Sequence, residues 1–206
     1  MVKIPGIIKR VFPEVIWEIK TNNKVQEKSV YLTFDDGPAP EVTNFVIETL
    51  NSFDAKATFF VVGNNVYKYP EIYKKIQENG HAIGNHTFNH LNGWKTSDTI
   101  YFQDVEKCNE LISSNLFRPP YGKMRLSQFK FLKKHYKIIF WSIISYDFDE
   151  NLSWHDCLTN VIKNIKPGSI VVFHDSIKAS KRLIPLLPIL LKTLKELKYK
   201  FEKLEF

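Results

Sequence analysis

Residues 30–38 have the sequence VYLTFDDGP, and the interpretation of the whole chain starts from this stretch. Its first five residues form an apolar, β-branched and aromatic run that predicts a buried strand. The Asp-Asp-Gly-Pro that follows is a turn signal, so the carboxylates of Asp35 and Asp36 stand where the strand ends. Two adjacent carboxylates at a buried strand end repel each other unless a cation or an arginine neutralises one of them.

Outward from this strand, short apolar runs alternate with longer segments of helical periodicity. Alternating strands and helices predict βα units and a parallel sheet, so the fold class is α/β. About six or seven such units in one chain favour a small or incomplete (β/α) barrel over a doubly wound sheet, with the site at the carboxyl ends of the strands. The strands are predicted over 30–34, 57–62, 81–84, 116–118, 137–142, 169–173 and 199–204, and the helices over 42–50, 69–78, 97–112, 126–135, 153–165 and 183–197.

The composition is that of an ordinary globular chain: 206 residues, 44% hydrophobic and 25% charged. The net charge of +7 is compatible with nucleic acid, but the lysines are scattered along helical segments, so we expect no nucleic-acid partner. No stretch approaches the ~20 apolar residues that cross a bilayer. Cys108 and Cys157 are far apart and are expected to be small core residues. We expect a monomer.

Residues 1–29 are predicted to be an N-terminal extension that packs on the catalytic domain, which spans residues 30–206. Within the extension, residues 7–17 are weakly amphipathic, so lying on a membrane surface is the alternative to packing on the domain. Residues 1–20 contain neither an uninterrupted apolar core nor a small-residue cleavage site, so no signal peptide is visible; this pattern is that of a cytoplasmic protein but leaves the compartment open.

Ionisable side chains follow five of the predicted strands, where they would gather at one edge of the sheet. Three of the six histidines are among them. The residues are Asp35 and Asp36 after the first strand, His86 and His90 after the third, Arg118 and Tyr121 after the fourth, Asp147 after the fifth and His174 at the end of the sixth.

Two histidines four residues apart can turn both imidazoles to one side of a helix or turn. A carboxylate from another strand then completes a three-ligand site with an open position for water, the arrangement of catalytic zinc. The alternatives are structural histidines at this common spacing and an Asp35 or Asp36 that only caps the following helix. Both features together favour a metal site.

Four motifs in order resemble those of the polysaccharide deacetylases, the NodB-homology domain of carbohydrate esterase family 4. They are TFDDGP at 33–38, HTFNH at 86–90, RPPYG at 118–122 and VFHD at 172–175, so the resemblance covers nearly the whole chain. It implies a distorted, incomplete (β/α) barrel with about seven strands, similar to a TIM barrel. It also implies metal-dependent hydrolysis of an acetyl group, usually from an N-acetylated sugar in a cell-surface polymer.

The resemblance also implies roles for individual residues. Asp36, His86 and His90 would bind a divalent ion, most often zinc, with cobalt or nickel as alternatives. Asp35 would be the general base, held by a bidentate contact from Arg118. The backbone N–H of Tyr121 would meet the oxyanion, and His174, oriented by Asp147, would be the general acid.

The fourth family motif is roughly D-x-x-D-W, whereas this chain has Ile144 in place of the first acid and Phe148 in place of the tryptophan. The lost acid affects support of that loop, and Phe148 can still form an apolar wall beside the acetyl methyl. Substrate binding is expected at Tyr121, Phe148 and Trp94, whose aromatic rings can stack on a sugar.

The function expected from this resemblance is removal of N-acetyl groups from GlcNAc- or MurNAc-containing glycans, either peptidoglycan-like or chitin-like. This reaction makes the chain a hydrolase of linear amides. One alternative is hydrolysis of another acyl group, such as that of O-acetyl xylan or a small amide. The other is a glycan-binding protein that kept the fold without turnover.

Overall fold

The strand predicted over residues 30–34 forms the centre of the sheet. The computed structural model describes residues 12–20 and 28–206. The strands are β1 (Lys28–Asp35), β2 (Thr58–Val61), β3 (Ala82–Asn85), β4 (Leu116–Phe117), β5 (Lys137–Ile138), β6 (Ile143–Ile144), β7 (Ile170–His174) and β8 (Tyr199–Phe201). Their order is β5-β4-β3-β2-β1-β7-β6, with β8 beside the start of β1, and these pairings are parallel.

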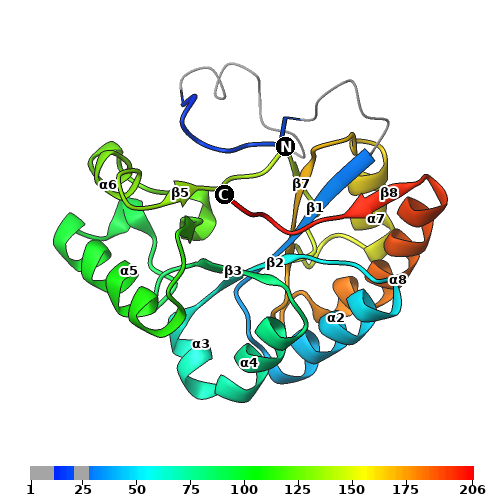
Figure 1. Cartoon of the computed structure of the whole chain (residues 1–206), viewed down its shortest axis with the longest axis horizontal. Helices are drawn as coiled ribbons and strands as arrows, with labels where there is room; N and C mark the ends of the chain where they lie inside the picture. The colour runs from blue at the N-terminus through cyan, green and yellow to red at the C-terminus, as the bar shows by residue number, and fades with distance from the viewer. Residues whose placement is uncertain (1–11, 21–27) are drawn as a thin grey trace.

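Helices follow most of the strands and form the outer layer around the curled sheet (Figure 1). They are α2 (Pro40–Ser52), α3 (Gly63–Lys68), α4 (Pro70–Glu78), α5 (Asp98–Ile112), α6 (Leu126–Leu132), α7 (Trp154–Ile162) and α8 (Ser180–Glu196). The helix expected to begin at Leu183 begins at Ser180, and it contains Pro185 and Pro188. The prediction of an α/β fold with a distorted, incomplete barrel is confirmed.

The barrel stays open between β5 and β6, which lie at opposite ends of the strand order although they are close in sequence. The single strand predicted over 137–142 is therefore wrong: this range holds the short strand β5 and a crossing segment that leads to β6. The side chain of Arg118 lies against this segment and donates from Nε to the carbonyl of Ile139 and from Nη2 to that of Phe140. The guanidinium of Arg118 thus supplies hydrogen bonds to carbonyls that would have paired with a neighbouring strand if β5 had continued.

Residues 12–20 lie across this opening. Ile16 donates its N–H to the carbonyl of Ile138 and accepts from the N–H of Phe140, while Ile19 donates to the carbonyl of Gly168 just before β7. The side chains of Val15 and Trp17 are buried. The remaining parts of the predicted extension, 1–11 and 21–27, lie outside the described residues, and the division into an extension and a catalytic domain stays a prediction.

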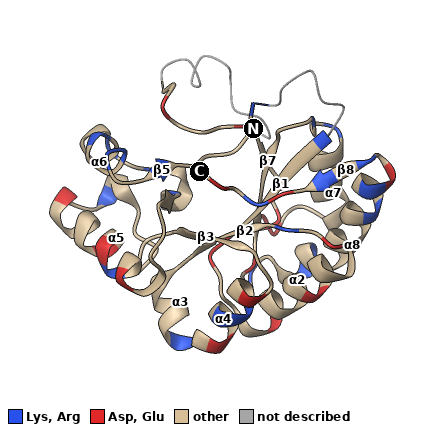
Figure 2. Ribbon diagram, in the orientation of Figure 1, with Lys and Arg blue, Asp and Glu red and all other residues tan. Residues whose placement is uncertain are grey.

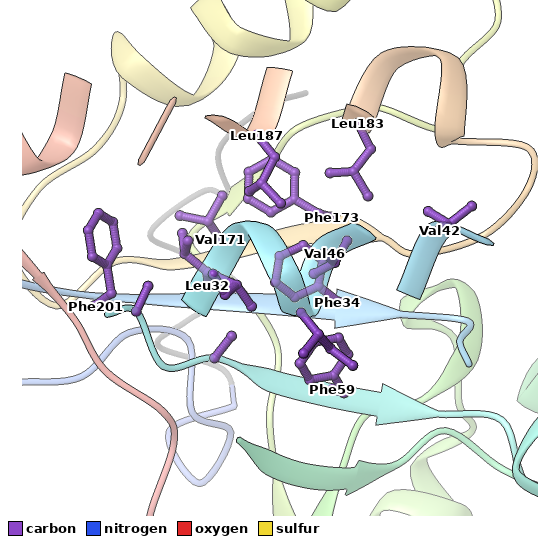
Figure 3. Packing of buried hydrophobic residues seen from close by; sticks show 14 of the residues in the cluster. Leu32, Phe34, Val42, Val46, Phe59, Val171, Phe173, Leu183, Leu187 and Phe201 are labelled. Carbon is purple, nitrogen blue, oxygen red and sulfur yellow. The ribbon is translucent and has the colours of Figure 1, made fainter. Parts of the chain in front are cut away.

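The two faces of β1 have different surroundings because side chains alternate along a strand. Leu32 and Phe34 pack outward against α2 and α8, and the ring of Phe34 lies between those of Phe59 and Phe173, with centroids 5.1 and 5.7 Å away (Figure 3). The alternate residues, including Asp35, face the barrel interior. Because the register pairs Asp35 with His174, an acid and a histidine stand side by side at the carboxyl ends of neighbouring strands.

The remaining composition-based expectations concern the cysteines, the membrane and the surface charge. Cys108 and Cys157 are buried free thiols, as predicted. Among the described residues, the search for a helix of sufficient length and apolarity to cross a membrane finds none. Lys and Arg are spread over the outer helices among Asp and Glu (Figure 2).

Candidate metal and catalytic site

Three side chains at the carboxyl ends of the strands converge on one point. Asp36 follows β1, and His86 and His90 follow β3. The Nε2 atom of His90 lies 3.0 Å from Oδ1 of Asp36, and that of His86 lies 3.6 Å from the same oxygen. One ligand atom from each residue lies within 4.8 Å of the others, a spacing that fits a single metal ion.

The two histidines are held so that their Nε2 atoms face Asp36. The Nδ1 of His86 lies 2.7 Å from the carbonyl of Arg118, which makes it the protonated nitrogen and leaves Nε2 as the ligand atom. The Nδ1 of His90 lies 3.1 Å from the hydroxyl of Tyr121. A partner on the second ring nitrogen is the usual way in which proteins orient a metal-binding imidazole. The donor set therefore fits a divalent ion.

The charges of the cluster also suit a cation. Burial lowers the pKa of His86 to about 4, against the opposing charge of Asp35, so its imidazole is neutral and available as a ligand. Burial alone would raise the pKa of the Asp36 carboxyl. The hydrogen bond from His90 and the charges of the neighbouring histidines hold that pKa well below its usual range, so Asp36 is ionised.

The segment that carries both histidines is a turn with an unusual backbone. Thr87 and His90 have φ values of 63° and 56°, in the left-handed region that side chains other than glycine rarely adopt. The Oδ1 of Asn85 accepts from the N–H of Thr87, and the Thr87 hydroxyl accepts from the N–H of Leu91. These contacts favour the turn-like alternative for the H-x-x-x-H motif over a helix.

Asp35, beside the ligand cluster, is buried against Arg118. The guanidinium Nη1 donates to Oδ1 of Asp35 over 2.6 Å and to the hydroxyl of Thr33 over 2.7 Å. This contact joins one oxygen of Asp35 to one nitrogen, rather than the bidentate pair implied by the resemblance, because the other donors of Arg118 face Ile139 and Phe140. The buried ion pair fixes the carboxylate of Asp35 at the edge of the site.

His174 and Asp147 form a second acid–base pair, and His174 stands beside Asp35 at the end of the neighbouring strand β7. Nδ1 of His174 lies 2.8 Å from Oδ1 of Asp147, and the backbone N–H of His174 donates to Oδ2 over 2.8 Å. Burial alone would lower the pKa of His174, but the charge and hydrogen bond of Asp147, with smaller contributions from Asp36 and Asp35, raise it to about 9. His174 is therefore an imidazolium at neutral pH.

The loop that lacks the expected first acid at Ile144 is supported by other groups. The N–H of Asp147 donates to the hydroxyl of Ser145, and Nε of the buried Arg182 donates to the carbonyl of Asp147 over 2.5 Å. Arg182 also donates to the carbonyl of Lys178. A helix α8 side chain thus holds the backbone of the residue that orients His174.

The ligand cluster, together with Asp35 and His174 from the two pairs, lines one hollow of about 330 Å³. Its apolar wall includes Ile144, Phe148, Val172 and Trp141, and the ring of Phe148 meets that of His174 edge to face, with centroids 5.0 Å apart. The remaining lining residues are Asp35, Asp36, His86, His90, Pro119, Tyr121, Gly122, Lys123, His174 and Lys178.

Trp94 lies outside this hollow and lines a neighbouring one of about 380 Å³. Tyr121, Gly122 and Trp141 border both hollows. Trp94 is 59% exposed, yet its indole N–H donates to the carbonyl of Met124 over 3.0 Å, so an exposed ring is held in place. The other wall of the second hollow includes Phe12, Val15 and Trp17 from the N-terminal segment.

Residues in the left-handed backbone region gather around the site. Backbone strain of this kind is common at functional sites, where the surrounding structure holds it. Five such residues other than glycine lie on its loops: Asp36, Thr87, His90, Tyr121 and Tyr146.

Several residues that support the site could not be found from the motifs. The amide of Asn65 in α3 donates to the carbonyl of Asp36, and α3 itself was not predicted. Asp104 lies in the buried stripe of α5, and Asp175 is the last residue of the VFHD motif, to which the resemblance assigns no role. An acid at i+3 from Tyr101 within an otherwise apolar helical stripe is a signal that could have singled out Asp104.

Beside the ligand cluster, Asp35 can take a proton and His174 can give one. This arrangement suits hydrolysis of an unreactive carbonyl compound. The fold and the site together define the class as that of metal-dependent hydrolases on an incomplete (β/α) barrel. Within that class, the chain belongs to the polysaccharide deacetylase family, carbohydrate esterase family 4, whose sequence model matches residues 22–136.

Several relatives are named as carbohydrate deacetylases. A peptidoglycan-N-acetylglucosamine deacetylase of Bacillus cereus is 34% identical over 91% of this chain and 89% of its own length. A chitooligosaccharide deacetylase of Azorhizobium caulinodans is 37% identical over 72% of this chain and 74% of its own. The crystal structure of the peptidoglycan N-acetylglucosamine deacetylase Bc1960 has a TM-score of 0.87 and 29% identity, covering 98% of this chain and 95% of that one. This chain spans 62% of the length of another Bacillus cereus deacetylase that it matches at 34% identity.

Proposed function

We propose that this chain removes N-acetyl groups from glycans that contain N-acetylglucosamine or N-acetylmuramic acid. The observation that carries the proposal is one hollow that is lined by the converging Asp36, His86 and His90 and also by Asp35 and His174. The relatives support the substrate class, since they include deacetylases named for peptidoglycan and for chitooligosaccharides. Hydrolysis of another acyl group on the same machinery is the second candidate.

Asp36, His86 and His90 would hold the metal, which we propose to be zinc because two imidazoles and one carboxylate are a common catalytic zinc ligand set. The ion would supply Lewis acidity that polarises the acetamide carbonyl and lowers the pKa of water. The chain supplies the other requirements: a neutral His86, an ionised Asp36, and ring orientations set by the Arg118 carbonyl and the Tyr121 hydroxyl.

Asp35 acts as the general base in this proposal. It takes the proton of the attacking water, and Arg118 keeps the carboxylate in position as the charge of Asp35 changes. The backbone N–H of Tyr121 donates to the oxyanion as the carbonyl carbon becomes tetrahedral. Phe148, with Ile144 and Val172, forms the apolar wall against which the acetyl methyl packs.

His174 acts as the general acid. Asp147 accepts from Nδ1, so Nε2 carries the proton that passes to the leaving amine when the C–N bond breaks. The products are the sugar with a free amino group and acetate, which contains the oxygen of the attacking water. The raised pKa of His174, about 9, keeps this proton in place at neutral pH.

The glycan would extend from the catalytic hollow over aromatic rings. Trp94, which is exposed and held, and Tyr121, which borders both hollows, are the proposed stacking platforms for neighbouring sugars. Lys and Arg are interspersed with acids on the outer helices (Figure 2), a distribution that favours a solvated surface over a nucleic-acid groove. We propose that the chain works as a monomer.

A substrate panel separates the candidate activities. Initial rates would be compared at equal concentration on N-acetylglucosamine oligomers, peptidoglycan fragments, O-acetyl xylan and a small acetamide. The proposal expects the highest kcat/KM on one of the two N-acetylated glycans. A higher kcat/KM on O-acetyl xylan or the small amide would instead select the second candidate.

The pH dependence of kcat is expected to report the titration of His174. Because the imidazolium is the active form, kcat should fall as pH rises through about 9. In Asp147→Asn the neutral asparagine no longer offsets the effect of burial, which lowers the pKa of His174. The alkaline limb of the kcat profile should therefore move towards or below the ordinary histidine pKa of 6.5. Rates from pH 5 to 10 for both proteins check this. An alkaline limb that stays in place in the variant would remove His174 from the role of general acid.

A further inference from the structure

Two buried carboxylates outside the catalytic hollow each bind the backbone of one metal-ligand turn. Asp175 follows β7 and is fully buried, and Asp104 lies in α5 and is 7% exposed. Neither lines the catalytic hollow. We infer that Asp104 and Asp175 are positioning residues that set the metal affinity of the site, and this inference rests on the proposed function.

Asp175 binds the turn that carries Asp36. Its Oδ1 accepts from the N–H of Gly37 over 3.1 Å, and its backbone N–H donates to the carbonyl of Asp35 over 3.1 Å. Residues 35 and 37, on either side of the ligand, are therefore both tied to Asp175. The fit is close, since a Cβ on Gly37 would come within 2.0 Å of Oδ2 of Asp175.

The second oxygen of Asp175 connects the same turn to the start of α2. Oδ2 accepts from the hydroxyl of Thr43 over 2.6 Å, and that hydroxyl accepts from the N–H of Ala39 over 2.8 Å. One carboxylate thus joins the end of β1, the first turn of α2 and the segment after β7. Its chain neighbour is His174, so the turn that carries Asp36 and the proposed general acid share one anchor.

Asp104 binds the turn that carries both histidines in the same manner. Its Oδ2 accepts from the N–H of Asn89 over 2.9 Å, and its Oδ1 accepts from the amide of the Asn89 side chain over 2.5 Å. The backbone carbonyl of Asp104 also accepts from the N–H of Phe88. Asn89 directly precedes His90, whose φ of 56° needs such external support.

The cost of losing these contacts should appear in metal affinity. The ligand turns contain left-handed residues, Asp36 on one and Thr87 and His90 on the other, so without the anchors they would relax to other backbone conformations. Part of the free energy of metal binding would then be needed to restore the ligand geometry, so the ion would bind more weakly. Outer groups that orient metal ligands typically contribute about 10- to 100-fold in affinity.

The variants Asp104→Ala, Asp104→Asn, Asp175→Ala and Asp175→Asn test this directly. Each asparagine can keep one acceptor and form the second bond after its partner reorients, whereas alanine loses both bonds. The dissociation constant for Zn²⁺ would be measured on metal-stripped full-length chain by competition with a chelating dye. We expect about a 10-fold or larger increase for each alanine variant and a smaller increase for each asparagine variant.

Ser153→Ala is the matched control for a loss of stability alone. Ser153 caps α7, where its hydroxyl accepts from the N–H of Asp156, and α7 does not carry either ligand turn. We expect a lower Tm with an unchanged Zn²⁺ affinity. Alanine variants at 104 and 175 that lower Tm without changing the dissociation constant would overturn the inference while leaving the proposed function standing. A wild-type chain that binds no Zn²⁺ would overturn both.

Discussion

His86→Ala is expected to lose metal binding and acetate release together. The imidazole is buried and neutral, its Nδ1 is engaged by the Arg118 carbonyl, and its Nε2 faces Asp36. Alanine removes one of three ligand atoms and leaves a polar cavity in its place. Losing several kcal/mol of transition-state stabilisation corresponds to a fall in kcat of about 1,000-fold or more. Metal content after dialysis and initial rates on the same preparation give both values.

His135→Ala is the control for this substitution. His135 is exposed and its ring contacts that of Phe131, with centroids 5.4 Å apart, away from the ligand cluster. It should keep both the metal and the wild-type rate. If His86→Ala retained one equivalent of metal and full turnover, the ligand assignment would be wrong.

Asp35→Asn is expected to keep the metal and lose most of kcat. Asparagine has nearly the shape of aspartate and can still accept from Nη1 of Arg118, so the neighbouring ligand turn should be preserved. The amide cannot take a proton from water, and removing a general base typically costs about 100- to 10,000-fold. KM should change far less than kcat, because Asp35 contributes to the transition state rather than to ground-state binding.

The matched acid-to-amide control is Asp149→Asn. Asp149 accepts hydrogen bonds from Asn151 within a local turn and does not line the catalytic hollow. This variant should keep both metal and turnover. A near-normal kcat in Asp35→Asn would exclude Asp35 as the general base, and another group that lines the hollow would have to take that role.

The fold could be predicted largely because its determinants are local. The run 30–34 and the alternating elements after it predict a buried strand and the βα order, and the number of units together with the motif resemblance favours the incomplete barrel. The segment 137–142 could not be interpreted correctly because its course depends on a distant residue. Arg118, far earlier in the chain, takes up the carbonyls of Ile139 and Phe140, and no local pattern contains that information.

The site could be predicted where its members carry chemistry and follow strand ends. The structure brings together Asp36, His86 and His90, and it pairs Asp35 with Arg118 and His174 with Asp147. The supporting residues Asp104 and Asp175 were missed because their hydrogen bonds connect side chains to backbone atoms elsewhere in the chain. Asp175 and Gly37 are 138 residues apart, and Asp104 binds Asn89 from within a helix that otherwise looks like ordinary packing.

The most direct test of the account is metal-dependent acetate release. Chain stripped of metal with a chelator, and the same chain reloaded with Zn²⁺, would be incubated with peptidoglycan fragments and with N-acetylglucosamine oligomers. The account predicts acetate from at least one glycan with the reloaded chain and none with the stripped chain. No acetate from either glycan with the reloaded chain, or equal release with and without metal, would contradict it.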